Sequence, residues 1–174
     1  MSSRAFVYFA ALAPAVAVAQ PAPAGGLELG ATGGAMLAET SGKDSTAYGG
    51  SLWGGYEIIR GDVGITPLAE MQFETFTGAH SGEILYVLPG VKLGFHRGAW
   101  IPAVDVGAGY AHAWAGTGAR ELARQSYTAL SVGAELMHQI LPRFAIGIAL
   151  HYRPVVAPDA QSFVDFGASA IVTL

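Results

Sequence analysis

Hydrophobic and polar residues alternate with a period of two along most of the chain. The pattern is clearest in residues 144–153, where every second position from Phe144 to Tyr152 carries a large apolar side chain. The positions between them are small or polar and end in His151 and Arg153. Successive side chains of a β-strand point to opposite faces, so this pattern predicts a strand with one large apolar face.

Seven other segments repeat the alternation, which predicts eight strands in all. They are residues 27–37, 48–58, 69–77, 85–95, 102–110, 129–136 and 164–174. Two residues depart from the pattern. Ile171 is apolar at a position of the small or polar set, and Pro89 would remove a ladder hydrogen bond, so we expect a β-bulge at Pro89.

The links between these segments alternate in length. The second, fourth and sixth links are tight, at residues 60–64, 97–99 and 141–143. The first, third, fifth and seventh are longer, at residues 39–45, 78–82, 116–126 and 154–161. Short turns on one side and longer loops on the other are typical of membrane β-barrels with periplasmic turns and outer loops.

Composition favours a membrane barrel over a soluble sandwich. The chain is 52% hydrophobic and only 13% charged, about half of the roughly 25% that ordinary globular domains carry. Beyond the first residues, no apolar run approaches the length of a transmembrane helix. A closed barrel is the remaining way to satisfy every backbone N–H and C=O group in hydrocarbon. The net charge of −4 is too small to indicate a nucleic-acid partner.

The N-terminal residues predict export. Arg4 precedes a short apolar run that ends in Ala17-Val18-Ala19, as in a signal peptide cleaved before Gln20. A second candidate cleavage site follows Ala24. We therefore expect a signal peptide at residues 1–19, a short segment at residues 20–26 and a barrel at residues 27–174. The chain has no cysteine, which excludes a lipoprotein anchor and a disulfide.

With this leader, these alternating segments and these tight links, the chain resembles the small eight-stranded outer-membrane barrels of the OmpA, OmpX and opacity-protein type. The resemblance implies an all-β, eight-stranded antiparallel up-and-down transmembrane β-barrel. It also implies the outer membrane of a Gram-negative-type bacterium, with both termini in the periplasm. The family includes anchors, adhesins, small pores and a few lipid-modifying enzymes, so the fold does not decide the function.

The positions opposite the apolar face predict a polar lumen. Charges in a narrow lumen should pair, and we expect Lys92 to pair with Asp105, and Glu135 with His151 or Arg153. An excess of carboxylates would favour cations if an ion path exists. The expected lumen network comprises Glu70, Lys92, Asp105, Glu135, His151, Arg153 and Asp165.

No motif predicts catalysis, a cofactor or a metal site. The five histidines are scattered singly, and none is followed two residues later by the serine that outer-membrane deacylases place there. The fifth link carries Arg120, Glu121 and Arg124 and is the most plausible recognition surface, either for lipopolysaccharide phosphates or for another cell.

The leading interpretation is a non-enzymatic, monomeric outer-membrane barrel with a plugged lumen that contributes to envelope structure or surface interaction. Its expected partners are outer-membrane lipid, lipopolysaccharide and the outer-membrane insertion machinery. Two alternatives remain open at this point. One is a small or gated pore, and the other is a soluble, lipocalin-like periplasmic barrel with its apolar residues inside.

Overall fold

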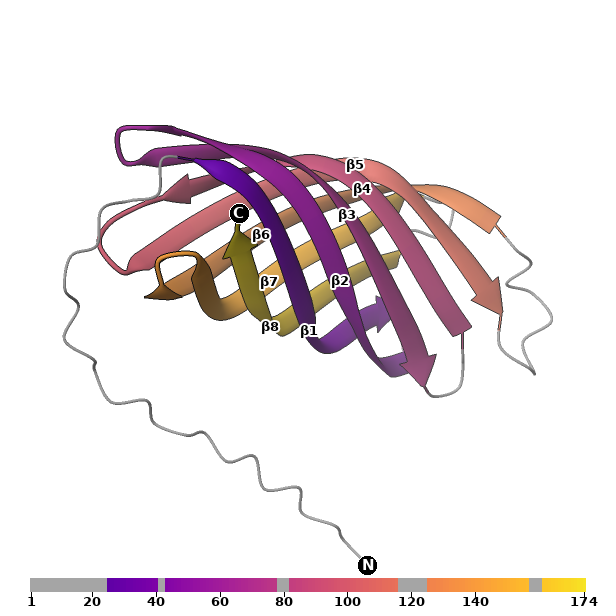
Figure 1. The fold of residues 1–174 in the computed structure, drawn as a ribbon. Helices are drawn as coiled ribbons and strands as arrows, with labels where there is room; N and C mark the ends of the chain where they lie inside the picture. Colours follow the sequence, from indigo (N-terminus) through magenta and orange to yellow (C-terminus); the bar gives the residue numbers. More distant parts are fainter. Residues whose placement is uncertain (1–24, 41–42, 78–81, 116–124, 157–160) are drawn as a thin grey trace, which may run out of the picture.

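The computed structural model describes residues 25–40, 43–77, 82–115, 125–156 and 161–174. In these residues, eight antiparallel strands close into one barrel in which β1 pairs with β8 (Figure 1). The strands are β1 (Gly26–Thr40), β2 (Lys43–Arg60), β3 (Val63–Thr77), β4 (Gly82–Phe95), β5 (Trp100–Ala115), β6 (Gln125–Leu141), β7 (Phe144–Val156) and β8 (Gln161–Thr173). This confirms the predicted all-β, eight-stranded up-and-down barrel. The expected signal peptide, residues 1–19, lies outside the described residues.

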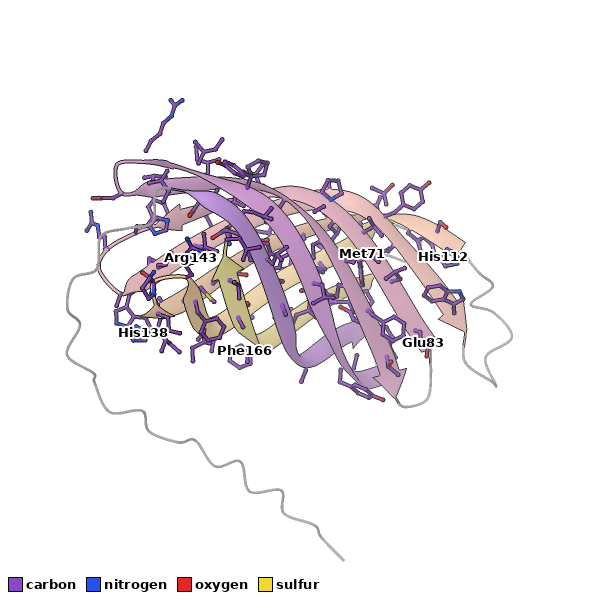
Figure 2. All side chains as sticks on the ribbon, viewed as in Figure 1. Met71, Glu83, His112, His138, Arg143 and Phe166 are labelled. Carbon is purple, nitrogen blue, oxygen red and sulfur yellow. The ribbon has the colours of Figure 1, made fainter. Side chains whose placement is uncertain are left out.

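Alternation along each strand divides the side chains between the lumen and the outer surface. On β7, Ala149, His151 and Arg153 are buried in the lumen, while Leu150 and Tyr152 are exposed outside. The same arrangement holds elsewhere, since Met71 and Phe166 are both exposed, and in Figure 2 the Phe166 ring projects away from the barrel. Among the described residues, no helix is long and apolar enough to cross a membrane.

The three tight links lie together at one end of the barrel (Figure 1). Gly61 and Gly98 adopt positive φ angles of 65° and 69° in the first two, a conformation that favours glycine. Pro142 and Arg143 connect β6 to β7. Both ends of the barrel sequence lie here too. The Thr173 N–H donates a 3.0 Å hydrogen bond to the carbonyl of Arg143 in the third turn, and the Leu174 N–H donates one of 2.8 Å to the Leu27 carbonyl. We call this the tight-turn end and the opposite one the loop end.

At the loop end the strands extend further than predicted. The pairing of β1 with β2 continues to Thr40 and Lys43, well inside the loop expected at residues 39–45. Likewise β6 begins at Gln125 and β7 continues to Val156. The alternation of apolar residues ends earlier than the strands do, because backbone pairing does not need an apolar outer face. The boundaries predicted for the first and seventh links were therefore wrong, whereas those of the third and fifth links agree with the structure within two residues.

Pro89 does not produce the expected bulge. The β4–β5 ladder is interrupted between Val87–Tyr110 and Gly90–Gly107, but the register is the same on both sides. Two residues lie unpaired on each strand. The missing proline N–H therefore interrupts the ladder locally but does not shift the strand register. The irregularity that does occur lies between Gln139 and Leu141 of β6, beside the turn at Pro142.

Candidate functional site: the barrel lumen

Two apolar layers narrow the lumen. The layer nearer the loop end consists of Ala47, Tyr86, Leu88, Ala111, Ala129, Val155 and Phe163. The layer nearer the tight-turn end consists of Trp53, Met137, Ala145 and Ile171. The predicted polar lumen thus also contains apolar side chains, and Ile171 departs from the alternating pattern because it belongs to the second of these layers.

An arginine lies at the centre of the charged network between these layers. Arg153 is only 1% exposed, and its guanidinium contacts Glu70 at 2.9 Å and also pairs with Asp165. Gln72 donates a 3.1 Å hydrogen bond to Asp165 and another to Glu74. These side-chain contacts link β3 across the lumen to β7 and β8, which lie on the other side of the barrel.

A second charged group lies towards the tight-turn end. Lys92 Nζ is 3.1 Å from Glu28 Oε2 and 3.8 Å from the centre of the Trp53 ring, over which it makes a cation–π contact. Thr66 donates a 3.1 Å hydrogen bond to the same Glu28 oxygen. Both charges are therefore compensated although both are buried.

His96 directly follows β4, in the turn that leads to β5, and its side chain contacts a residue at the tight-turn end of the lumen. Its Nε2 donates a 2.8 Å hydrogen bond to Glu57 Oε1. This hydrogen bond, opposed by partial burial, raises the pKa of His96 above the ordinary value of 6.5.

The raised pKa of His96 predicts a pH-dependent contribution to stability. A group whose pKa is raised on folding stabilises the folded state fully below the unfolded pKa and loses this effect as pH rises through the folded pKa. We expect the urea midpoint of the wild type to exceed that of His96→Gln below pH about 6.5, and the difference to shrink at higher pH. A series of urea titrations between about pH 5 and pH 9 measures it. Arg97→Gln, at the exposed neighbouring position, serves as the control, and an equal difference at every pH would contradict the account.

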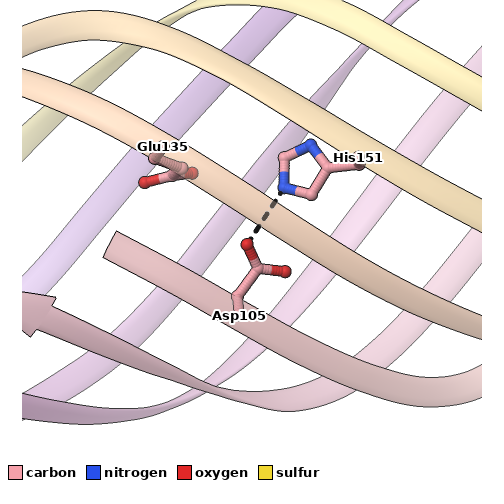
Figure 3. A group of neighbouring side chains, drawn as sticks. All are labelled: Asp105, Glu135 and His151. Carbon is pink, nitrogen blue, oxygen red and sulfur yellow. Dashed lines mark ion pairs between the residues drawn. The ribbon is translucent and has the colours of Figure 1, made fainter. Parts of the chain in front are cut away.

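Asp105, Glu135 and His151 form a third group at the middle of the lumen (Figure 3). One potential ligand atom of each residue lies within 4.8 Å of those of the other two, and His151 Nε2 is 3.3 Å from Asp105 Oδ2. The residues come from the adjacent strands β5, β6 and β7. The expected lumen network included all three residues, but they are 16 or more positions apart in the sequence, and it is the register of the β5–β6 and β6–β7 ladders that brings their side chains this close.

The structure places all seven residues of the expected lumen network on the inner face, but with different partners. Lys92 faces Asp105 across the β4–β5 ladder yet pairs with Glu28, and His151 contacts Asp105 rather than Glu135. The expected pairs were therefore wrong. Sequence neighbours across a hairpin were considered, whereas a closed barrel also brings together side chains from strands that are not adjacent. The expected recognition residues Arg120, Glu121 and Arg124 lie outside the described residues.

A histidine–serine contact was missed because only serines two residues after a histidine were considered. His112 on β5 and Ser126 on β6 are cross-strand partners, and His112 Nδ1 is 2.9 Å from Ser126 Oγ on the outer surface near the loop end. His112 is labelled in Figure 2 at that end, with Glu83. The described hydrogen bonds and ion pairs give the His112 ring no carboxylate partner, so the acid that orients the histidine of a catalytic triad is not part of this arrangement.

The outer surface has the chemistry of a lipid-facing one. Large apolar side chains project from all eight strands, among them Leu52 at 69% exposed, Val106 at 58% and Val132 at 55%. Trp100 and Tyr56 are exposed towards the tight-turn end, where amphipathic rings suit a membrane interface. A water-facing barrel would have its polar set outside, so the lipocalin-like arrangement with apolar residues inside does not describe this chain.

Comparison with known proteins supports the same fold. No protein-family model and no curated protein sequence matches the chain. Among solved structures, Neisserial surface protein A (NspA) is similar with a TM-score of 0.67 at 12% identity, covering 89% of this chain and 100% of that one. The outer membrane enzyme PagL has a TM-score of 0.58 at 15% identity, covering 84% and 99%. The attachment invasion locus protein Ail of Yersinia pestis, in complex with the heparin analogue sucrose octasulfate, has a TM-score of 0.55 at 19% identity, covering 84% and 97%.

These identities are too low to transfer an activity, and the three proteins differ in what they do. What they share with this chain is the barrel fold, which the matches cover over 84–89% of this chain and 97–100% of theirs. The chain has the fold of the small eight-stranded outer-membrane barrels.

Proposed function

We propose that this protein is a non-enzymatic integral outer-membrane barrel with a plugged lumen, which contributes to envelope structure or to surface interaction. The observation that carries the proposal is the filling of the lumen. Arg153, Tyr86 and Phe163 are each no more than 1% exposed and occupy its centre and its loop end. Two cavities of the described lumen, one lined by Arg153 and the other nearer the tight-turn end, measure about 20 and 30 Å³, which is room for a few water molecules each.

The proposed orientation puts the tight-turn end, with both termini, in the periplasm and the loop end outside, as in other barrels of this kind. Lipid and lipopolysaccharide are then the obligatory surroundings, and the insertion machinery is the partner during assembly. The link between β5 and β6 carries Arg120 and Arg124, which suit contact with lipopolysaccharide phosphates.

Conductance distinguishes a plugged barrel from the alternative of a small or gated pore. The wild-type protein in a planar lipid bilayer should give no reproducible conductance steps, because the ion pairs and apolar layers leave no continuous water column. Regular steps that change size in Lys92→Ala would contradict the proposal, since only a path through the lumen is sensitive to that side chain.

The non-enzymatic assignment has its own test at Ser126 and His112. A serine activated by a histidine reacts with fluorophosphonate probes, whereas an ordinary serine does not. We expect no labelling of the folded barrel in lipid. Labelling that disappears in both Ser126→Ala and His112→Gln would overturn the assignment and indicate a hydrolase acting at the outer surface.

A further inference from the structure

We propose that Asp105, Glu135 and His151 bind a single divalent metal ion of the zinc type inside the barrel. The inference is independent of the proposed function, because a metal could bind in the lumen of either a plugged barrel or a pore. The three ligands come from three consecutive strands, β5, β6 and β7, so a bound metal would link these strands through their side chains in addition to the backbone ladders.

Strand register accounts for the meeting of these side chains. Asp105 on β5 and His151 on β7 are both paired with Gly133, one from each side of β6. A Cβ atom at Gly133 would collide with Asp105 and would lie 2.6 Å from His151 Nε2. The two side chains therefore meet over β6 only because position 133 has no side chain. Glu135, two residues further along β6, lies on the same inner face and adds the third group.

Two oxygens of the group are buried without a hydrogen-bond partner. They are Asp105 Oδ2 and Glu135 Oε2, and the Glu135 residue is only 7% exposed. His151 Nε2 is 3.3 Å from Asp105 Oδ2, but the two do not form a hydrogen bond. A buried carboxylate oxygen without a partner is strongly unfavourable, and a bound cation would satisfy both oxygens at once.

The charge balance of the lumen also favours a cation at this place. Among the described residues, seven carboxylates face the lumen, from Glu28, Glu57, Glu70, Glu74, Asp105, Glu135 and Asp165. The lysine and arginine side chains that face it are Lys92 and Arg153, which pair with Glu28 and with Glu70 and Asp165 respectively. These pairs leave four carboxylates without a permanent positive partner. Glu57 has His96 and Glu74 accepts a hydrogen bond from Gln72, whereas Asp105 and Glu135 lie together with His151.

The donor set indicates the class of metal. An imidazole nitrogen with two carboxylate oxygens suits zinc and its neighbours, whereas magnesium and calcium sites use oxygen ligands throughout. Tetrahedral bonds of about 2.0–2.1 Å place two ligand atoms about 3.3 Å apart. The His151–Asp105 distance of 3.3 Å already matches that edge. Glu135 must move closer by a small side-chain rotation.

The surrounding space allows access and further ligands. Glu135 lines the cavity of about 30 Å³ at the tight-turn end, and His151 lines the central cavity of about 20 Å³. A water molecule needs roughly 10–15 Å³ of such space, so one can complete the coordination of a metal with three protein ligands.

The test uses the untagged chain folded in detergent, stripped with a chelator and then titrated with Zn²⁺ alone. Isothermal titration calorimetry, with elemental analysis of the dialysed protein, should show one zinc per chain. His151→Gln and Glu135→Gln should each weaken binding at least about tenfold, the lower end of what loss of even an outer-shell partner costs. His96→Gln and Glu74→Gln change a buried histidine and a buried glutamate outside the group, and they should bind zinc as the wild type does.

Two further measurements guard against misfolded variants. Each variant is accepted only if it shows the same gel shift on boiling as the wild type. Co²⁺, which replaces zinc and absorbs visible light, should give a visible spectrum with the wild type, and Glu135→Gln should need at least about tenfold more Co²⁺ to reach half of its own maximum. Absence of stoichiometric zinc in the wild type, or equal loss of binding in the His96→Gln and Glu74→Gln controls, would overturn the proposal.

Discussion

Replacement of Arg153 with methionine is expected to lower the free energy of unfolding by about 3–5 kcal/mol. The guanidinium is 1% exposed and contacts both Glu70 and Asp165, so its removal leaves two carboxylates unpaired in the lumen. A buried charge without its partner is far more unfavourable than the original pair was favourable. Urea unfolding in lipid vesicles, followed by tryptophan fluorescence, measures the change.

Two controls separate the buried charge from the loss of an arginine as such. Arg143→Met, in the exposed turn between β6 and β7, should change stability by no more than about 0.5 kcal/mol. The triple variant Arg153→Met, Glu70→Gln, Asp165→Asn should recover much of the loss, because no charge is then left unpaired. A loss at Arg153 no larger than at Arg143 would show that the ion pairs do not stabilise the barrel.

A positive charge on the outer face is the second change with a large expected effect. Val132 lies midway along β6 and is 55% exposed on the apolar outer surface. If this surface faces lipid, Val132→Arg should destabilise the folded barrel by about 2–4 kcal/mol in vesicles, the cost of an arginine near the bilayer midplane. Reversible urea unfolding in vesicles of one lipid composition gives the value.

The matched control lies on the same strand at the tight-turn end. Leu141 is 57% exposed, as Val132 is, but it ends β6 where the membrane interface should lie. Leu141→Arg should therefore cost only about 0–1 kcal/mol. Equal destabilisation at the two positions would mean that the cost of an arginine does not depend on its depth in the bilayer, and the outer surface would then not face lipid.

The number of strands, their pairing and their inner and outer faces were predictable because one simple rule relates them to the sequence. A lipid-facing surface needs apolar residues at every second position, as from Phe144 to Tyr152, and this period leaves a visible pattern. The tight links were equally visible, since Gly61 and Gly98 occupy conformations that favour glycine. The strand ends at the first and seventh links were not visible, because backbone pairing does not require an apolar outer face.

The interior of the lumen was only partly predictable. A lumen-facing position can hold either a polar residue with a hydrogen-bond or ionic partner or an apolar residue packed against other apolar side chains. The residue types of Trp53 and Ile171 alone therefore could not show that they face the lumen. Partner choice depends on how closure sets strands that are distant in sequence across the lumen from one another. That geometry brings Lys92 of β4 to Glu28 of β1. Neither the alternation of residue types nor the pairing within hairpins could predict this contact. The meeting of Asp105 and His151 has a local cause, the missing side chain of Gly133, but the cause becomes visible only once the register is known.

Gel mobility of the refolded chain, with and without boiling, tests the central claim most directly. A closed barrel with an apolar outer surface should insert into lipid vesicles and remain compact in detergent until it is heated. The account predicts a fast band in the unheated, membrane-associated sample that shifts to the mobility of the unfolded chain only after boiling. A protein that stays in the aqueous fraction and migrates identically in both lanes would contradict it.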